Sequence, residues 1–336
     1  MAGLPHTPAN PVEALIGLAS GLWVSRILWA AARLGIADAV EMEPTSLATI
    51  AERTGTHEGN LRRLMNALVS VGLFRAEGEE RYVHSDLSPF LRSDNPISQR
   101  AFIESVFGGE HYAGWGAIED SVRGGGTAFD SVFGKPVFDW YSAHPNEAQK
   151  FSRAMEGTTR VIEMALMATW TPPPFTVAVD VGGSRGTLVA SLLQRNPDAR
   201  GILFDLPDII EGVEPTITDT RIDLVGGSFF DSVPEGDLYL LKMILHDWTD
   251  EQSEAILRTI RSAIRPGGHV AIIETVLPEQ PGAHPGHLMD VNMMVMTGGR
   301  ERSEADFAAL LDRTGFKLES LTPTPAVMSV VQAVAV

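Results

Sequence analysis

LYLLKMILHDW, residues 238–248, is a hydrophobic run that leads directly into a histidine. Apart from Lys242 the run is apolar, which predicts a buried central strand over 238–245 with His246 at its carboxyl end. Earlier in the chain, VAVDVGGSRG (177–186) is a second apolar strand that breaks into a glycine-rich turn. Open α/β sheets bind their ligands at the carboxyl ends of strands. We therefore expect a cofactor loop and a proton acceptor on neighbouring strand ends, which favours group transfer.

Predicted strands and helices alternate on both sides of these two segments. Strands are expected at 176–181, 201–205, 238–245 and 269–276, with helices at 186–195 and 250–264. Thr249 and Gln252 form a capping-box pattern at the start of the last helix, and Pro266-Gly267-Gly268 is expected to stop it. The tail 318–336 is expected to form a final hairpin. This alternation predicts an α/β Rossmann-like domain with a mostly parallel sheet over 175–336.

The first hundred residues predict a mostly α-helical domain. Residues 12–40 are apolar on nearly every side, so we expect this helical segment to pack across the two-fold axis of a homodimer. Burial inside a single domain is the alternative. Residues 46–85 have the outline of a winged helix-turn-helix. Its second helix offers only Arg62 and Arg63 as adjacent basic residues, with Glu58 close by, so we interpret the module as a scaffold.

A third segment, 101–174, is predicted to be a helical connector rich in aromatic residues, some of which could line a flat substrate pocket. TPPP at 171–174 cannot continue a helix or enter a central strand, and it marks the expected domain boundary.

The composition limits the classes of partner and location. The chain of 336 residues has no cysteine and a formal net charge of −17, which disfavours nucleic acid and anionic membranes as partners. No apolar run approaches the ~20 residues of a membrane span. The amino terminus does not have the pattern of a signal peptide. A cytoplasmic protein is therefore expected.

The glycine-rich loop indicates which kind of cofactor to expect. Gly182, Gly183 and Gly186 have the spacing GGxxG, which departs from the GxGxxG of dinucleotide-binding proteins and argues against nicotinamide or flavin. Asp180 precedes the loop, and Asp205 falls where the next strand should end. A carboxylate there is well placed to accept hydrogen bonds from both ribose hydroxyls. Together these residues favour a nucleoside-containing cofactor.

In combination, several motifs identify a family. They are DVGGSRG, FDLP, GGSFF-SVPEGD, LKMILHDW, RPGGHVAIIETVLPE and GGRERSEADF. Over nearly its whole length the chain resembles the S-adenosyl-L-methionine-dependent small-molecule O-methyltransferases of the plant caffeate and flavonoid type, and their bacterial polyketide-tailoring relatives. The resemblance implies a dimer, a winged-helix dimerisation domain, a Rossmann-like catalytic domain and S-adenosyl-L-methionine as cofactor.

The resemblance also implies roles for individual residues. The loop of Gly182 and Gly183 would face the cofactor, Asp205 would bind ribose, and Lys242 would lie close by. We assign Asp180, Leu206, Ser228 and Phe229 to the same cofactor site. His246 would be the catalytic base, flanked by Glu274 and Glu301, and Phe151 and Met155 would lie near the transferred methyl.

Two positions depart from the family pattern. Ser184 replaces a loop glycine, which should be tolerated if its φ is negative. Ser228 replaces an aspartate that often contacts adenine, and its hydroxyl would bind more weakly.

The chemistry explains why a histidine would suit this position. A phenol has a pKa near ~10 and a free histidine one of ~6.5, so His246 would accept the proton while the oxygen attacks, and not beforehand. Glu274 or Glu301 would orient the imidazole, with Asp247 as a third candidate.

The acceptor pocket is less well specified by the sequence. Trp140, Asp290, Met293 and Met294 are candidates to face an aromatic acceptor. The spacing of His284, His287 and Asp290 could suggest a metal, but these residues lie in a segment rich in proline and glycine, and no metal is expected.

We therefore expect a methyl transfer from S-adenosyl-L-methionine to a hydroxyl of an aromatic secondary metabolite. Two alternatives remain at this point. One is an enzyme of the same fold that uses the cofactor for another reaction, such as hydroxylation. The other is a winged-helix regulator.

Overall fold

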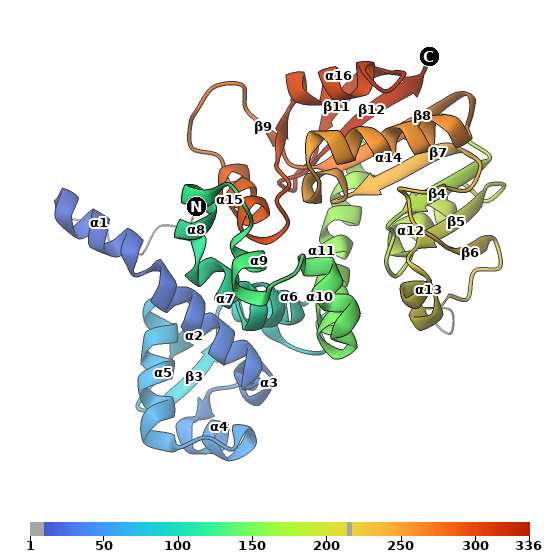
Figure 1. Ribbon diagram of the computed structural model, residues 1–336. Helices are drawn as coiled ribbons and strands as arrows, with labels where there is room; N and C mark the ends of the chain where they lie inside the picture. Colours follow the sequence, from blue (N-terminus) through green and yellow to red (C-terminus); the bar gives the residue numbers. More distant parts are fainter. Residues whose placement is uncertain (1–9, 214–216) are drawn as a thin grey trace. The chain divides into compact units, whose positions relative to one another are not determined.

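The computed structural model of the chain describes residues 10–213 and 217–336, and it divides into two compact units (Figure 1). The first unit contains the described residues up to Ala113 together with His144–Thr158. The second contains Gly114–Ala143 and Thr159–Val336. The boundary expected at 171–174 therefore lies inside the second unit. This difference arises because one helix, α11 (Pro145–Thr169), contributes its first half to one unit and its second half to the other.

The second unit is built on a seven-stranded sheet with the order β11-β12-β8-β7-β4-β5-β6. Its strands are β4 (Val177–Val181), β5 (Arg200–Asp205), β6 (Ile222–Gly226), β7 (Gly236–Lys242), β8 (Ile264–Glu274), β11 (Phe316–Pro323) and β12 (Ser329–Ala335). The five strands from β8 to β6 are parallel, whereas β12 runs antiparallel to both β8 and β11. The predicted α/β fold and final hairpin are confirmed. Strand order reverses between β4 and β7, which is the point where such sheets bind ligands.

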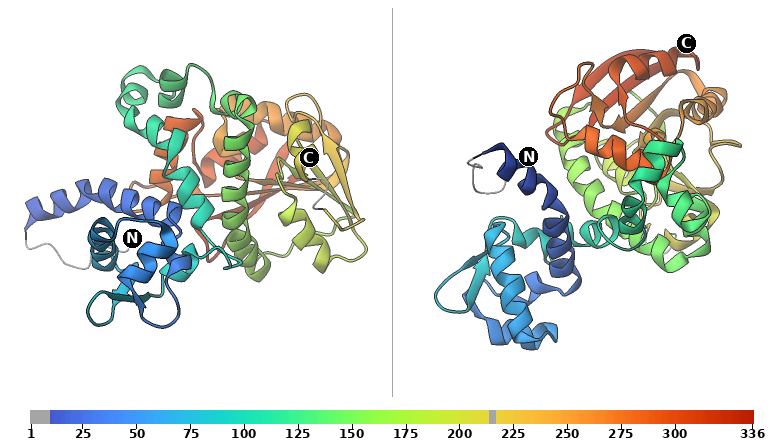
Figure 2. Two further views of the ribbon diagram at one scale, coloured as in Figure 1. Left: turned by 90° about the horizontal axis from the view of Figure 1, so that it is seen from below. Right: turned by 60° about the vertical axis from the view of Figure 1, so that its left-hand side comes forward.

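Helices cover both faces of this sheet because its strands alternate apolar side chains between the two faces (Figure 2). The covering helices are α12 (Thr187–Arg195), α13 (Pro207–Val213), α14 (Asp250–Ala263), α16 (Glu304–Asp312) and the second half of α11. Helices α14 and α16 pack on the face that includes Val179, Leu241 and Ile272. Helices α11, α12 and α13 pack on the opposite face, which includes Ala178 and Leu240.

The helix predicted over 250–264 is α14, but the residues expected to stop it have another role. The Thr249 side chain caps the helix and Gln252 completes the capping box, as predicted. The helix ends at Ala263, however, and Pro266-Gly267-Gly268 lies within the bounds of β8. The residues expected to stop the helix therefore belong to the following strand, which begins at Ile264.

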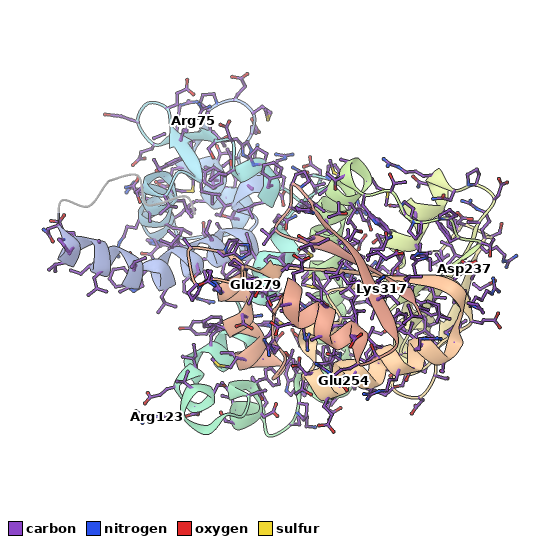
Figure 3. All side chains as sticks on the ribbon, turned by 90° about the horizontal axis from the view of Figure 1, so that it is seen from above. Arg75, Arg123, Asp237, Glu254, Glu279 and Lys317 are labelled. Carbon is purple, nitrogen blue, oxygen red and sulfur yellow. The ribbon has the colours of Figure 1, made fainter. Side chains whose placement is uncertain are left out.

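The strand predicted over 238–245 also ends early. β7 ends at Lys242, and Met243 then adopts a positive φ of 56°, which turns the chain out of the sheet. His246 consequently lies in a short 3₁₀ helix, η3 (Leu245–Asp247), and not at the last position of the strand. At the opposite end of the same strand Asp237, labelled in Figure 3, accepts hydrogen bonds from the backbone of Thr176 and Val177 and so fixes the start of β4.

Short elements complete the second unit. They are α8 (Ile118–Gly124), α9 (Ala128–Phe133), α10 (Val137–Ala143), β9 (Val276–Leu277), α15 (Gly286–Met296), β10 (Arg302–Ser303) and the last residues of α7 (Gly109–Gly116). β9 and β10 pair in parallel, with Arg302 opposite Val276. This pairing brings residues 299–302 close to the carboxyl end of β8.

The first unit has the predicted helix-turn-helix followed by a hairpin. Its elements are α1 (Pro11–Ala19), α2 (Gly21–Arg33), α3 (Ile36–Ala39), β1 (Thr45–Ser46), α4 (Leu47–Thr54), α5 (Glu58–Ser70), β2 (Phe74–Ala76), β3 (Arg81–His84), η1 (Ser88–Leu91), α6 (Arg100–Val106) and the first parts of α7 and α11. Gly55 ends α4 in the left-handed region. Arg62 on α5 pairs with Glu58 and Glu80, so part of the positive charge of that helix is neutralised.

The apolar amino-terminal segment is divided into α1, α2 and α3 and is not one continuous helix. Large apolar side chains remain exposed along α1 and the start of α2: Val12, Leu15, Ile16, Leu18, Leu22 and Trp23. By length and composition alone, Pro11–Arg33 passes the test for a membrane-spanning helix, contrary to the expectation that no stretch would. Core helices of soluble proteins and signal sequences can have the same length and composition, so the observation establishes an uncovered apolar surface and no more.

Candidate active site

His246 lies at the centre of a group of buried acidic residues. The residue is 3% exposed, and its backbone N–H donates to Glu274 Oε1 at 3.1 Å. The same oxygen accepts the N–H of Ile244, also at 3.1 Å. Glu274, the last residue of β8, therefore holds the backbone of the turn that follows β7. It does not hydrogen-bond to the imidazole ring.

Glu301 is the residue that orients the imidazole. Its Oε1 lies 2.8 Å from His246 Nδ1, and the Glu301 side chain is completely buried. A carboxylate only accepts, so Nδ1 carries the proton and Nε2 is the basic atom of the neutral ring. Nε2 makes no hydrogen bond within the described residues, and Asp247 Oδ1 lies 3.9 Å from it. Of the three carboxylates considered from the sequence, Glu301 thus occupies the position that orients the ring.

The carboxylates around His246 change its basicity. Burial by itself lowers the pKa of His246, but Asp247, Glu301 and Glu274 outweigh it and raise that pKa to about 9. Burial in turn raises the pKa of Glu274 to about 7 and that of Asp247 to about 6. The imidazole is therefore a stronger base than a free histidine, and its neutral form becomes the major one only at alkaline pH.

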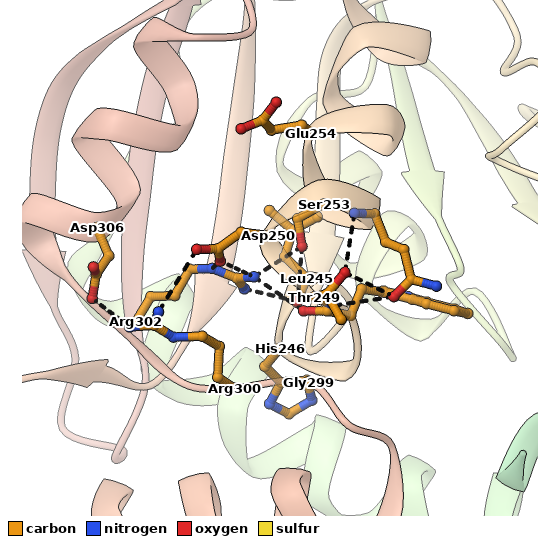
Figure 4. Close-up of polar contacts among 12 residues, drawn as sticks. Leu245, His246, Thr249, Asp250, Ser253, Glu254, Gly299, Arg300, Arg302 and Asp306 are labelled. Carbon is orange, nitrogen blue, oxygen red and sulfur yellow. Dashed lines mark hydrogen bonds and ion pairs between the residues drawn. The ribbon is translucent and has the colours of Figure 1, made fainter. Parts of the chain in front are cut away.

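Arg302 holds the segment carrying Glu301 against the segment carrying His246 (Figure 4). The guanidinium is fully buried and donates to the Leu245 carbonyl at 2.8 Å and the Trp248 carbonyl at 3.0 Å. It also donates to Asp250 and to Ser253, in the first turn of α14. One side chain thereby joins η3, the start of α14 and β10.

Close backbone packing and one further carboxylate position the Glu301 segment. A Cβ on Gly299 would lie 2.0 Å from the His246 carbonyl oxygen, so a larger residue could not approach η3 this closely. The Glu301 N–H donates to Asp290 Oδ1 at 2.9 Å. Asp290 was expected to face the acceptor, and in the structure one of its oxygens supports Glu301.

The glycine-rich loop after β4 has the tight turn predicted for it. Gly182 and Gly186 adopt φ values of 65° and 68°. A Cβ on Gly183 would lie 2.6 Å from the Asp180 carboxyl carbon. Asp180 is itself buried beneath the loop, where its Oδ2 accepts the Val189 N–H at 3.3 Å, and burial raises its pKa to about 7. Asp180 therefore supports the loop and the start of α12 from within the protein.

Asp205 anchors the same loop from the end of β5. Its two oxygens accept the N–H groups of Ser184, at 2.8 Å, and Leu206, at 2.7 Å. Each carboxylate oxygen keeps a further lone pair, so both can still accept hydrogen bonds from neighbouring hydroxyls of a ribose. The residues present thus fit the nucleoside part of a cofactor.

Comparisons with known proteins agree with this arrangement. Residues 115–317 match the model of an O-methyltransferase domain, and residues 16–94 match that of an O-methyltransferase dimerisation domain. A phenazine O-methyltransferase of Lysobacter antibioticus is 35% identical over 324 residues, which cover 95% of each chain.

Two solved structures extend the likeness to ligand complexes. Human N-acetylserotonin methyltransferase in complex with S-adenosylmethionine has a TM-score of 0.91 and 27% identity, over 98% of this chain and 99% of the other. An O-methyltransferase from neocarzinostatin biosynthesis, in complex with S-adenosylmethionine and 2-hydroxy-5-methyl naphthoic acid, has a TM-score of 0.81 and 29% identity, over 99% and 100%.

The chain belongs to the O-methyltransferase family.

It is an S-adenosyl-L-methionine-dependent O-methyltransferase, with an amino-terminal helical dimerisation domain and a Rossmann-like catalytic domain. The cofactor supplies a methyl group activated by a sulfonium. Residues of the second unit that were predicted to hold it lie at the carboxyl ends of β4, β5 and β7 or directly after them. Lys242, the last residue of β7, is near Asp180, and its burial lowers its pKa.

The remaining predicted cofactor residues come directly after β5 or shortly after β6, at the same edge of the sheet. Leu206 is half exposed next to Asp205. Ser228 follows β6, and its hydroxyl accepts the Phe230 N–H at 3.2 Å while its proton stays available for a ligand. The neighbouring Phe229 makes an edge contact with Trp248. Direct contacts of these residues with the cofactor stay predictions.

Predicted acceptor residues are distributed over both units. Trp140 packs edge-on to Phe129, and Met293 is buried on α15, where Met294 is partly exposed. Phe151 and Met155 lie on the first half of α11, in the first unit, where the ring of Phe151 stacks on His111. Their roles stay predictions. Among the residues described, no group of three or more His, Asp or Glu side chains could hold a metal ion.

Sequence reasoning missed Gly299 and Arg302 as residues that shape the site. Both belong to the GGRERSEADF motif, which was noted for the family resemblance alone. An arginine directly after a candidate catalytic glutamate could have indicated a structural clamp. Its partners, however, lie about fifty residues away in the chain and become visible only in the fold.

The loop contains one strained position, and relieving it should stabilise the protein. Ser184 has a φ of 52°, so the negative φ on which its tolerance was made conditional is not adopted, and this conformation costs a non-glycine residue about 1–2 kcal/mol. Ser184→Gly should raise the free energy of unfolding by about 1 kcal/mol in urea denaturation. Ser262→Gly, in the regular helix α14, is the control and should lower it. A Ser184→Gly variant no more stable than the natural chain would contradict the assignment of strain.

The effect of Glu301 on the imidazole can be measured directly. Glu301→Gln removes a negative charge and a charged hydrogen bond, both of which raise the pKa of His246. That pKa should therefore fall, by about one unit or more, in an NMR titration of isotope-labelled histidine. Glu279→Gln, at an exposed position, should leave it unchanged. An unshifted His246 in the Glu301→Gln protein would show that the hydrogen bond does not control the ring.

Proposed function

We propose that this methyltransferase transfers the methyl group of S-adenosyl-L-methionine to a hydroxyl of an aromatic small molecule of secondary metabolism, with His246 as general base. The observation that carries the proposal is the hydrogen bond between Glu301 and His246 Nδ1. It leaves Nε2 as the basic atom, and Nε2 has no hydrogen-bond partner among the described residues. The relatives support the acceptor class, since a phenazine and a hydroxylated naphthoic acid are both aromatic.

The charge arrangement suits a proton transfer that accompanies attack. With a pKa of about 9, the imidazole is close in basicity to a phenol of pKa ~10, so the transfer is nearly balanced. The proton passes from the acceptor hydroxyl to Nε2 as the oxygen bonds to the methyl carbon. Glu301 and Asp247 then stabilise the imidazolium.

The carboxylates around His246 also limit the fraction of the enzyme that has a neutral imidazole at pH 7. A base with a pKa of about 9 is neutral in about one molecule in a hundred at pH 7. A positively charged cofactor next to the ring disfavours the imidazolium and lowers that pKa. With the cofactor bound, the enzyme is therefore expected to be active at lower pH than the His246 pKa of the cofactor-free protein would indicate.

The first unit supports a homodimer as part of the proposal. Its exposed apolar side chains on α1 and α2 form a surface whose exposure to water is unfavourable, and the dimerisation-domain match begins at residue 16, within α1.

We also propose a cytoplasmic location, because the relatives are biosynthetic enzymes. The alternative of a DNA-binding regulator is disfavoured by the pairing of Arg62 with two glutamates.

Replacing the base tests the proposed chemistry. His246→Ala should lower methyl transfer about 10²–10⁴-fold and leave cofactor binding intact, because the imidazole acts on the acceptor proton. Turnover of a panel of hydroxylated naphthoic acids and phenazines would be followed by mass, and the expected product gains one methylene. His269→Ala, at a histidine paired with Glu319 on β8 and β11, is the control and should keep full activity. Full activity of His246→Ala across pH would contradict the role of His246. A product that gained oxygen would favour the hydroxylation alternative.

Charge placed on the apolar surface tests the dimer. Trp23 is 72% exposed and Leu22 51% exposed. The double substitution Leu22→Glu with Trp23→Glu should convert a dimer to a monomer in analytical ultracentrifugation, because the new carboxylates would have to be desolvated in the interface. Val327→Glu, at an exposed apolar residue between β11 and β12, should leave the dimer intact. A dimer that survives the double substitution would place the interface elsewhere.

A further inference from the structure

Glu163 is a buried glutamate with no role in the chemistry described so far. It lies on the second half of α11 and is 7% exposed. Its Oε2 accepts a hydrogen bond from Ser191 Oγ at 3.2 Å, and it also interacts with Thr187. Both partners lie on α12, which begins directly after the glycine-rich loop. Glu163 is therefore attached to the loop side of the cofactor site.

The other carboxylate oxygen, Oε1, is buried and has no hydrogen-bond partner. An acceptor left in this condition costs free energy, more so if it is charged, unless a ligand or another group satisfies it. Burial raises the pKa of Glu163, as expected for a carboxylate without a direct counter-charge. The unsatisfied oxygen is an observation of geometry, and it indicates a missing hydrogen-bond donor.

The surroundings of Glu163 favour a positively charged donor. Lys242 is the partly buried cation that interacts with Glu163, Asp180 and Asp247, so three carboxylates surround one ammonium group. No hydrogen bond or ion pair joins Lys242 to Glu163 within the described part of the chain. Arg160, one turn earlier on α11, also acts on Glu163 electrostatically, but its side chain belongs to an exposed residue. The cluster of Lys242 and its three carboxylates therefore carries more negative than positive charge.

S-adenosyl-L-methionine carries two cations, and only one can satisfy this oxygen. The sulfonium has no N–H or O–H group, and its methyl must lie near His246, where Asp247 provides a carboxylate. The ammonium of the methionine moiety has three N–H donors. Glu163 is held at α12, after the glycine-rich loop, and not at η3. A carboxylate oxygen with a free lone pair at this position matches the ammonium.

We propose that Glu163 is a cofactor-binding residue that accepts a hydrogen bond from the ammonium group of S-adenosyl-L-methionine, with Ser191 and Thr187 holding the carboxylate in place. The proposal rests on the cofactor alone and is independent of the acceptor and of His246. It gives α11 a part in cofactor binding through its second half.

Calorimetric titration with two ligands tests the assignment. One is S-adenosyl-L-homocysteine. The other is 5′-S-(3-carboxypropyl)-5′-thioadenosine, the same molecule without its amino group. The natural protein should bind the first more tightly. Glu163→Gln should weaken S-adenosyl-L-homocysteine about tenfold or more and leave the affinity for the deaminated ligand unchanged, because only the first ligand donates to the carboxylate.

The other outcomes would overturn the proposal. Equal weakening of both ligands would mean that Glu163 only supports the loop, and no weakening would mean that the ammonium binds elsewhere. Glu235→Gln, at an exposed glutamate paired with Arg265, is the matched control and should change neither affinity. Glu163→Asp, which keeps the charge but withdraws it by one methylene, should show a smaller loss confined to the amino-bearing ligand. Thermal melting of each variant would separate loss of binding from loss of fold. Failure of the natural protein to bind either ligand would overturn the cofactor assignment itself.

Discussion

The buried guanidinium of Arg302 is the interaction on which the geometry of the site depends. Its donors reach two carbonyls of the turn after β7 and two side chains of the first turn of α14. Removing one of these partners is costly because it leaves a donor of the buried guanidinium without an acceptor. The segment of Glu301 therefore cannot move relative to η3 without breaking several charge-assisted bonds together. The imidazole and the carboxylate that orients it are consequently held in one geometry before any ligand binds.

The catalytic unit combines this rigid arrangement with an excess of buried negative charge. Glu274, Asp247 and Glu301 surround His246 at the end of β7. Asp180 on β4 and Glu163 on α11 lie near Lys242, the last residue of β7. Burial raises the pKa of several of these carboxylates, so they are costly to keep ionised while the site holds no additional cation. A cofactor with a net positive charge would relieve that cost. The affinity for the cofactor and the basicity of the imidazole are therefore coupled through the same charges.

Local patterns were reliable wherever the chemistry of neighbouring residues decides the structure. The apolar run of β4 and its glycines predicted the strand and the tight loop, and Thr249 with Gln252 predicted the start of α14. They failed where a distant contact overrides a local preference. Met243 and Ser184 both adopt positive φ, which their side chains disfavour, so no local pattern indicated these turns. The predicted end of β7 was wrong for that reason, and the positive φ of Ser184 within the correctly predicted tight loop was not anticipated.

The sequence by itself determined the α/β class, the family motifs, the cofactor type and His246 as the candidate base. The α/β class and the strand-end position of His246 follow from hydrophobic periodicity, whereas the cofactor type follows from the family resemblance that the motifs carry, and all of these rest on short segments. Tertiary structure alone decided that Glu301, and not Glu274, binds the imidazole, and that Arg302 clamps both segments. It also revealed the unsatisfied oxygen of Glu163. The physical reason is that a hydrogen bond depends on distance and direction between groups far apart in the chain, and these exist only when the sheet has brought its strand ends together.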